Sequence, residues 1–435
     1  MALIFRDKIN KLRNITTSRL NYFCIMMEGL FNSLGIDIIG MTTIVPLFLR
    51  DYGASMTMVG ALPTIQAVSM AVTPLIAGNF VATAKRKKWI SLTFNGTART
   101  SVLFLPLLLL IGTPNNVLVI VFFCIFTMFF ICNSLTSIVW HNLLGTCVLP
   151  QQRGKLLGHL FAMSGALSFI SANVVRILRE NEAMTLDHRY AAIFGLGGIL
   201  VACSVLFFIP LREPDSIAQD KNERTLKFYI ESLFRCIKNK YFQRMIITQA
   251  LSQICMTINT FAFIFANEHL GLSTQWISYM LIIQPVGVIC GGLLTAQISA
   301  RFGSKRTVLT AEILAIAIPI LQLIALFANS TGMPINIAPA FMLAVTFIIG
   351  FNRSSLMAFH QYLLDVAGKE NNVYFIVARS TILLPLSFIS IFIGMYFDRF
   401  SHFLQPIYIF QICVSVAVIF CATRLKLYIF SKNQQ

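Results

Sequence analysis

The chain has 435 residues, of which 57% are hydrophobic and only 12% are charged, and its formal net charge at pH 7 is +17. Soluble domains have about a quarter of their residues charged, so this composition excludes an ordinary soluble protein. Apolar stretches of about 20 residues recur along the chain, which is the length that a helix needs to cross a bilayer, and they predict an all-α membrane protein.

The predicted elements begin with residues 1–19, which are too polar for a signal peptide and which we interpret as a cytoplasmic tail. Six spans then fill residues 20–210: they are 20–48, 56–79, 89–112, 115–141, 156–178 and 190–210. A polar linker follows at residues 211–243. Six more spans fill residues 244–424: they are 244–267, 276–298, 306–328, 338–362, 374–396 and 403–424. With a second tail at residues 425–435, we expect twelve transmembrane helices in two pseudo-symmetric six-helix bundles.

The linker contains the sequence TLKFYIESLFRCIKNKYF, in which apolar and aromatic residues recur on one helical face. The residues on that face are Leu226, Tyr229, Leu233, Ile237 and Tyr241. This pattern predicts a helix that lies on the inner membrane surface. An ordinary amphipathic linker would show nearly the same pattern, so both interpretations stay open.

Lysine and arginine are distributed unevenly between the two sides of this topology. With the N-terminus in the cytoplasm, 26 of the 34 lie in cytoplasmic segments, 5 in external segments and 3 inside spans. An excess of basic residues in cytoplasmic loops sets the orientation of membrane proteins. We therefore expect a multi-pass protein of the cell membrane with both termini in the cytoplasm. The same distribution explains the net charge without a nucleic-acid partner.

Enzyme signatures are absent from the sequence. There is no H-E-x-x-H, no glycine-rich phosphate-binding loop with its Lys-Ser/Thr, and no G-x-S-x-G. We therefore expect neither an enzyme nor an ATP-driven pump. The ten cysteines are scattered, mostly inside spans, without the spacing of metal ligands or of a disulfide framework, so we expect free thiols. No cofactor and no metal is predicted.

The two predicted bundles resemble each other in sequence. GASMTMVGALPTIQ at residues 53–66 aligns with GLSTQWISYMLIIQ at residues 271–284. Asn133 aligns with Asn352 at nearly the same separation. A shared separation predicts a duplicated unit of six helices, as in many transporters.

Twelve spans in two parallel repeats around a polar linker resemble the major facilitator superfamily. The family's pattern G-x-x-x-D-R-x-G-R-R, between the second and third helices of each half, is similar to ARFGSKR between spans 8 and 9. The matching residues are Arg301, Gly303, Lys305 and Arg306, and Ala300 stands where the family has its acid. A second familiar feature is PQQRGKLLG after span 4, with Arg153 and Gly154. The resemblance implies that these residues form gating loops, without the family's usual ion pair at Ala300.

Polar side chains gather on spans 1, 4, 7 and 10. Polar groups deep in a bilayer usually face the bundle interior, a partner or water. In the family that this chain resembles, the first and fourth helices of each half line the central cavity, and these are the same four spans. Together the pattern and the resemblance predict a set of substrate-binding residues. They are Asn32, Ser134, Trp140, Gln249, Gln253, Thr260, Asn352 and Arg353.

Two of these residues have alternative interpretations. Arg353 would bind an anionic group of a substrate, or it would hold a carboxylate in a permanent ion pair that fixes span 10 to another helix. Trp140 would stack on a substrate, or it would anchor the inner end of span 4 at the membrane interface.

Glu28 is the first candidate for a proton-coupling group, because opening and closing a cavity of low dielectric constant can load and unload a carboxyl. Its alternative is a permanent ion pair with Arg99 or Arg379. Asp37 is the second candidate and lies nine residues further on, about half a turn round a straight helix. We expect Arg99, Glu312 and Arg379 to form ion pairs between helices.

The resemblance implies a secondary active transporter that moves a small organic solute by alternating access, and the acidic candidates predict coupling to protons. The alternatives are a flippase for a lipid or a lipid-linked headgroup and, from another class, a non-transporting membrane sensor. Expected partners are a small-molecule substrate, membrane lipids and protons, and the chain is expected to be a monomer. The sequence leaves the substrate and the direction of transport open.

Overall fold

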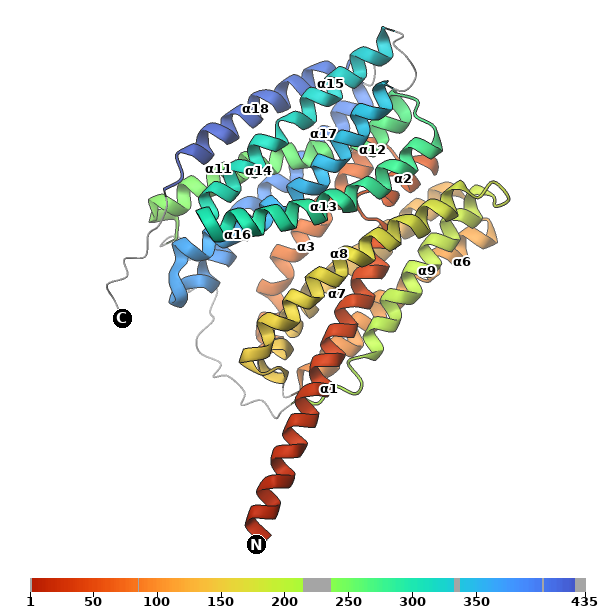
Figure 1. Cartoon of the computed structure of the whole chain (residues 1–435). Coiled ribbons are helices and arrows are strands. Elements are labelled where there is room, and N and C mark those ends of the chain that lie inside the picture. The colour runs from red at the N-terminus through yellow and green to blue at the C-terminus, as the bar shows by residue number, and fades with distance from the viewer. Residues whose placement is uncertain (1, 85, 214–235, 332–336, 401–402, 427–435) are drawn as a thin grey trace. The chain divides into compact units, whose positions relative to one another are not determined.

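The structure, a computed structural model, describes residues 2–84, 86–213, 236–331, 337–400 and 403–426. Within these ranges every regular element is a helix, so the predicted all-α class is confirmed (Figure 1). The amphipathic helix predicted for the linker falls mainly on residues 214–235, outside the described residues.

The first part of the chain forms helices α1 to α9. Their bounds are α1 (Ala2–Ile39), α2 (Ile44–Asp51), α3 (Met56–Thr83), α4 (Lys87–Ile90), the π-helix η1 (Ser91–Asn95), α5 (Gly96–Ser101), α6 (Phe104–Ile111), α7 (Asn115–Cys147), α8 (Pro150–Glu180) and α9 (Leu186–Leu206). Gly112 ends α6 with a φ of 74°, a left-handed conformation that glycine adopts without strain. Pro150 begins α8 at the first helical position, where its missing N–H costs nothing.

The second part of the chain forms helices α11 to α18. Their bounds are α11 (Lys240–Asn259), α12 (Ala262–Ile264), the π-helix η2 (Phe265–His269), α13 (Thr274–Phe302), α14 (Ser304–Ala315), α15 (Ala317–Ser330), α16 (Ile337–Leu383), the 3₁₀ helix η3 (Leu384–Phe388), α17 (Ile389–Arg399) and α18 (Gln405–Thr423). Predicted spans 10 and 11 are not separated by a loop, because α16 runs through span 10 and into the first part of span 11, and η3 and α17 follow directly. No proline interrupts the chain between Pro339 and Pro385, so no residue there forces the helix to end.

Eleven helical segments among the described residues are long and apolar enough to cross a membrane. They correspond to eleven of the twelve predicted spans. The remaining predicted span, 156–178, lies inside α8, whose 31 residues exceed the length that a crossing needs.

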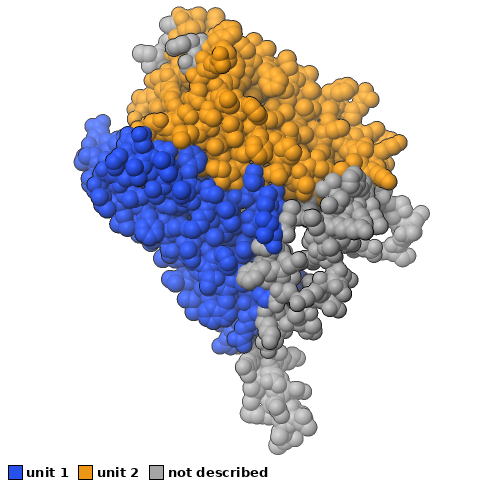
Figure 2. All heavy atoms as spheres, turned by 180° about the vertical axis from the view of Figure 1, so that it is seen from behind, with its two compact units in different colours: residues 1–41, 68–223 blue, residues 42–67, 224–435 orange. Residues whose placement is uncertain are grey.

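Contacts between residues divide the chain into two compact units, which Figure 2 shows in different colours. Unit 1 comprises residues 1–41 and 68–223, and unit 2 comprises residues 42–67 and 224–435. The N-terminal bundle expected from sequence, 20–210, includes residues 42–67, which here cluster with unit 2. The division into the two sequence repeats stays a prediction.

In unit 1, α1 packs closely on α8 and α9. Glycines allow the approach to α9: a Cβ on Gly35 would lie 2.7 Å from the carbonyl oxygen of Gly197, and a Cβ on Gly197 would lie 2.7 Å from Ile39. Small residues at such crossings let helix backbones approach, and close packing is a main source of helix association in membranes. This contact fixes α1, which supplies the acidic residue of the site below.

In unit 2, the closest pair of long helices is α13 and α16. A Cβ on Gly291 would lie 2.5 Å from the Phe351 carbonyl oxygen, and Gly287 and Gly350 face backbone carbonyls at still closer range. Residues 42–67 are held in the same unit by side chains. The Arg50 guanidinium forms two hydrogen bonds with the Glu268 carboxylate, at 2.6 and 2.8 Å.

Candidate functional site

A cavity of about 360 Å³ lies within unit 1, between α1, η1, α5, α7 and α8. The residues that line it are Glu28, Gly29, Asn32, Ser33, Asn95, Arg99, Asn133, Thr136, Ser137, Trp140, Leu160 and Ser164. Only Gly29 and Leu160 lack a polar group in the side chain. Its volume falls in the range of about 300–1,000 Å³ that is typical of small-molecule sites. The helices around it are apolar, so the cavity concentrates the hydrogen-bonding groups of this unit.

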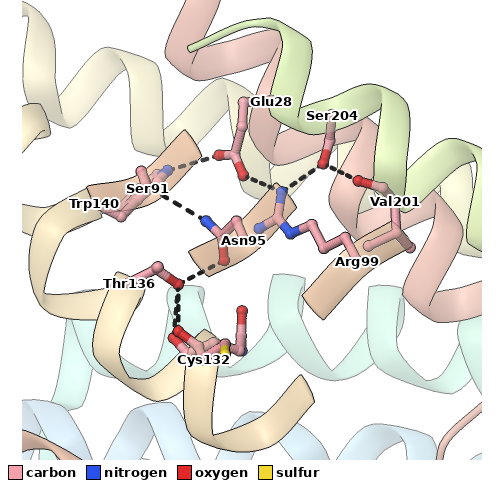
Figure 3. A network of polar contacts seen from close by, with 10 residues as sticks. Glu28, Ser91, Asn95, Arg99, Cys132, Thr136, Trp140, Val201 and Ser204 are labelled. Carbon is pink, nitrogen blue, oxygen red and sulfur yellow. Dashed lines mark hydrogen bonds and ion pairs between the residues drawn. The ribbon is translucent and has the colours of Figure 1, made fainter. Parts of the chain in front are cut away.

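The wall at Asn95 is built on the π-helical turn η1. Single π turns inside helices are rare, but those that occur are often found at functional sites. The Asn95 amide donates to the Ser91 hydroxyl at 3.3 Å and accepts from the Thr136 hydroxyl at 2.6 Å (Figure 3). Both ends of the amide are therefore held, one within η1 and the other by α7, and the side chain has a fixed orientation.

Glu28 lies between a guanidinium and an indole (Figure 3). Arg99 Nη1 donates to Glu28 Oε1 at 2.8 Å, and Trp140 Nε1 donates to Glu28 Oε2 at 2.8 Å. The same Arg99 nitrogen also donates to the hydroxyl of Ser204, which in turn donates to the Val201 carbonyl. Four helical elements, α1, α5, α7 and α9, thus meet at one carboxylate.

The charges of this site compensate each other inside the protein. Glu28 is 2% exposed and Arg99 is 4% exposed, so neither charge is solvated by bulk water. A buried ion pair is tolerated when its geometry is good and additional hydrogen bonds satisfy both partners, as Trp140 and Ser204 do here. The pair leaves the cavity with no net charge from Glu28 and Arg99.

Two polar atoms at the site are buried without a hydrogen-bond partner. They are Asn32 Oδ1, an acceptor, and Arg99 Nε, a donor. Buried polar atoms are nearly always hydrogen-bonded in folded proteins, so an unpartnered donor and acceptor beside a cavity fit a bound molecule that has both kinds of group. The arrangement suits recognition by hydrogen bonds and by the ring of Trp140.

The structure brings four of the predicted residues together at this cavity: Glu28, Asn32, Arg99 and Trp140. Ser134 is buried but does not line it. On α7 the lining positions are Asn133, Thr136, Ser137 and Trp140, of which Trp140 alone is among the predicted residues.

Asn95 and Thr136 line the cavity, and the sequence interpretation missed them. A signal was present, because Asn95 and Arg99 are four residues apart and therefore neighbours on one helical face.

The predicted residues of the second half belong to unit 2 and do not line this cavity. Gln249 and Asn352 are buried, and each has a side-chain oxygen without a partner. Arg353 is exposed, and Gln253 and Thr260 are half-buried. Their substrate-binding role stays a prediction.

Asp37 lies on α1 away from this cavity. Its carboxylate accepts a hydrogen bond from the hydroxyl of Ser168 on α8. Nine residues separate Asp37 from Glu28, which places the two carboxyls on different faces of α1. Asp37 therefore serves the packing of α1 on α8 in this structure, and its coupling role stays a prediction.

The predicted gating residues lie at helix ends. Arg153 donates to the carbonyls of Gly145 and Val148, so its positive charge meets the C-terminal end of α7, where a helix dipole favours a cation. Gly154 is in the first turns of α8.

At the second loop, Gly303 joins α13 and α14 with a φ of 81°. Arg301 is exposed, Lys305 is half-buried, and the Arg306 guanidinium lies 5.0 Å from the centre of the Phe302 ring. Although the family's acid is absent at Ala300, an acid is supplied from α16: the Ser304 hydroxyl donates to Asp365 Oδ2 at 2.5 Å.

Two of the three interhelix ion-pair predictions differ from the structure. Arg99 pairs with Glu28. Among the described residues, neither Glu312 nor Arg379 takes part in an ion pair. Glu312 instead accepts a hydrogen bond from the Ser252 hydroxyl.

Comparisons with known proteins give one family and several similar folds. A family model described as "Major Facilitator Superfamily" matches residues 23–384. A mutant of the nucleoside transporter NupG has a TM-score of 0.65 at 13% identity, over 93% of this chain and 100% of that chain. The D-xylose-proton symporter has a TM-score of 0.67 at 14% identity, over 95% of this chain and 98% of that chain.

A bacterial homologue of the human lysosomal transporter Spinster, in an inward-facing and unoccupied conformation, has a TM-score of 0.59 at 13% identity, over 93% of this chain and 95% of that chain. At these identities the likeness is one of fold. A search of curated proteins found no match.

Proposed function

The chain belongs to the major facilitator superfamily, and from this membership we propose that it is a proton-coupled secondary active transporter of a small, neutral, hydrogen-bonding solute. The family model covers most of the chain, including the helices that build the cavity. In such a transporter the two halves expose a central site alternately to each side of the membrane. We propose the cell membrane as its location, with both termini in the cytoplasm, on the distribution of basic residues.

The observation that supports a neutral solute is the polar lining of the cavity in unit 1. Its two buried charges, Glu28 and Arg99, already neutralise each other at 2.8 Å. An anion or a cation entering the cavity would have to compete with that pair in a medium of low dielectric constant. A neutral molecule with hydroxyl or amide groups would instead meet amides and hydroxyls that both donate and accept.

Side chains around the cavity favour a ring-shaped solute. Trp140 presents an indole whose N–H is occupied by Glu28, so its aromatic surface remains for contact. Aromatic faces contribute large apolar area at little entropic cost, and they pack well against planar or puckered rings. Nucleosides and D-xylose, named for two of the similar structures, are neutral hydroxylated rings. They are suitable first probes for this chain.

Proton coupling is proposed on chemical grounds. A neutral solute carries no charge that a membrane potential could act on, so its uphill transport needs an ion that the protein itself binds. Buried carboxyls are the usual proton carriers inside membranes. The cavity's own carboxyl, Glu28, has both oxygens engaged by N–H donors, an arrangement that the ionised carboxylate satisfies.

Thermal unfolding of the purified protein tests the substrate class. The panel contains uridine and D-xylose as neutral rings, lactate as an anion and choline as a cation. A ligand present at about a hundred times its dissociation constant adds about 2.7 kcal/mol to the stability of the folded state. We expect a neutral ring to raise the melting temperature of the wild type. The charged solutes should have no effect.

Two variants make the test specific to the cavity. Asn95→Ala removes a fixed amide from the lining and should abolish the stabilisation. Ser134→Ala alters a buried serine of the same region that does not line the cavity, and it should respond as the wild type does. Stabilisation by a charged solute alone, or an equal response in Asn95→Ala, would contradict the proposed solute class.

A further inference from the structure

A second buried carboxyl lies in unit 2, inside a segment that is long and apolar enough to cross a membrane. Glu312 is 4% exposed and sits on α14, within Ser304–Ser330, one of the segments that can cross a membrane. It lies eight residues after Ser304, about 12 Å along the helix at 1.5 Å per residue. Its side chain is too short to reach either end of the segment Ser304–Ser330.

The Glu312 carboxyl has one hydrogen bond in the described part of the chain. The Ser252 hydroxyl of α11 donates to its Oε1 at 2.8 Å. None of the ion pairs between described residues includes Glu312. The setting therefore differs from that of Glu28, whose two oxygens are held by a guanidinium and an indole N–H.

The neighbouring helices offer Glu312 no compensating charge. Helix α14 packs against α13, α15, α16 and α18, and α11 reaches it through Ser252. Within the segments of these helices that can cross a membrane, the basic residue that lies more than four positions from a segment end is Arg353, and its side chain is exposed. No ion pair between described residues joins Arg353 to Glu312. No cation in the described part of the chain therefore stabilises a carboxylate at this position.

A seam of polar groups leads away from Glu312 along α11. Ser252 and Cys255 are one turn apart, and the Cys255 sulfur lies 3.5 Å from the Ser415 hydroxyl of α18. Further along, Gln411 of α18 donates to Asn259 Oδ1 at 2.8 Å. Unit 2 thus contains a series of hydrogen-bonding groups along α11 and α18, and the carboxyl near its start has no ion pair with any described residue.

We propose that Glu312 is the residue that takes up and releases the coupling proton, an inference that rests on the proton-coupled transport proposed above. In the packed arrangement, one Glu312 oxygen holds a proton taken from water, and the side chain is neutral. When water reaches the site, the O–H bond breaks, the proton returns to water and the carboxylate remains. Burial without a cation makes the ionised form costly, so hydration of the site controls the exchange.

Infrared difference spectroscopy of the full chain in lipid tests this assignment without knowledge of the substrate. A protonated carboxyl has a carbonyl stretching band that the carboxylate lacks. Spectra are recorded in steps from about pH 4 to about pH 9, the range that covers exposed and buried glutamates. We expect a band that disappears as the pH rises in the wild type and in Glu28→Gln, and that is missing in Glu312→Gln.

Ser252→Ala is the second variant, and it keeps the test decisive should Glu312→Gln not fold. It removes the single hydrogen bond to the carboxyl, so the frequency of the same band should change. A titrating band that persists in Glu312→Gln, or one with the same frequency in Ser252→Ala, overturns the assignment. The assignment is also overturned if the band is absent from Glu312→Gln but present in the wild type at every pH, because the Glu312 carboxyl would then never release its proton.

Transport in liposomes separates this inference from the proposed function. Uptake of uridine and of D-xylose is measured with and without an inward proton gradient. If neither gradient-driven uptake nor exchange occurs while the Glu312 band titrates, the proposed function fails and the proton site stands. If the wild type is driven by the gradient, Glu312→Gln should lose that drive and keep exchange of solute across the membrane. If the proton gradient drives uptake by Glu312→Gln as strongly as uptake by the wild type, the assignment of Glu312 is overturned and the proposed function is not.

Discussion

Asp398 and Thr57 are joined by two hydrogen bonds: one oxygen of the Asp398 carboxylate accepts from the Thr57 backbone N–H at 2.9 Å and from its hydroxyl at 2.6 Å. The other carboxylate oxygen accepts from the Met56 backbone N–H at 2.8 Å. Met56 begins α3, so a side chain from α17, more than 300 residues away in sequence, caps this helix. The negative charge also complements the N-terminal end of the helix dipole.

Removing this cap should loosen the start of α3. Replacement of an N-cap acceptor by alanine costs about 0.5–2 kcal/mol, and we expect Asp398→Ala to lower the free energy of unfolding by an amount in that range and so to lower the melting temperature. Asp398→Asn keeps an acceptor oxygen and should lose less. Equal melting temperatures for the wild type and Asp398→Ala would show that the cap adds nothing to stability.

Breaking the buried ion pair between Glu28 and Arg99 should lower the stability of the protein more than removing the Asp398 cap does. Arg99→Ala leaves the Glu28 carboxylate buried without its cation, and breaking such a pair costs about 3–5 kcal/mol. The double variant Arg99→Met with Glu28→Gln removes both charges and should be more stable than Arg99→Ala alone. Thermal unfolding of the three proteins checks the order, and a double variant no better than Arg99→Ala would mean that the lost charge balance is not the cause.

Trp140 should contribute through its N–H as well as its ring. Trp140→Phe keeps an aromatic ring in the cavity wall and removes the donor to Glu28 Oε2, and a hydrogen bond to a charged group is worth about 1.5–3 kcal/mol. The control is Trp89→Phe, because Trp89 is 55% exposed. We expect a lower melting temperature only for Trp140→Phe; the same loss in both variants would point to a general effect of removing an indole.

Gly291 and Gly292 are neighbours on α13, and replacing each of them by alanine gives a test variant and its control. A Cβ on Gly291 would meet the backbone of α16, whereas a Cβ on Gly292 would have nothing within 4 Å. Overpacking costs about 1–3 kcal/mol, so Gly291→Ala should lower the melting temperature. Gly292→Ala should leave it unchanged or raise it slightly, since alanine is the better helix former. Similar melting temperatures for both variants would contradict this close contact between α13 and α16.

The transmembrane helices were predictable because the signal is an average: the mean hydropathy of about 20 residues changes little when a single residue is polar. Eleven predicted spans coincide with apolar helical segments, and α7 is a typical case, with 33 residues and no charged side chain. The boundary between spans 10 and 11 was harder. Charged residues there indicated a loop, but charge alone does not end a helix, and α16 continues until the chain approaches Pro385.

The site was predictable only in part. Glu28 and Arg99 stood out because charges inside apolar spans need a partner, and one of the predicted pairings is the one that forms. Asn95 did not, because an amide on a span carries no such requirement and because the π turn before it shifts the face on which it lies. Ser134 was chosen by spacing on a single helix, which cannot show the side of α7 that its neighbours cover.

The glycine contact between α13 and α16 has a consequence for rotation. With the backbone of each helix pressed into the other at Gly287, Gly291 and Gly350, neither helix can turn about its own long axis without driving a side chain into a carbonyl. Helices α13 and α16 must therefore move together as one rigid unit. Any such movement therefore carries the buried Asn352 and the exposed Arg353 along together, without turning either of them about the axis of α16.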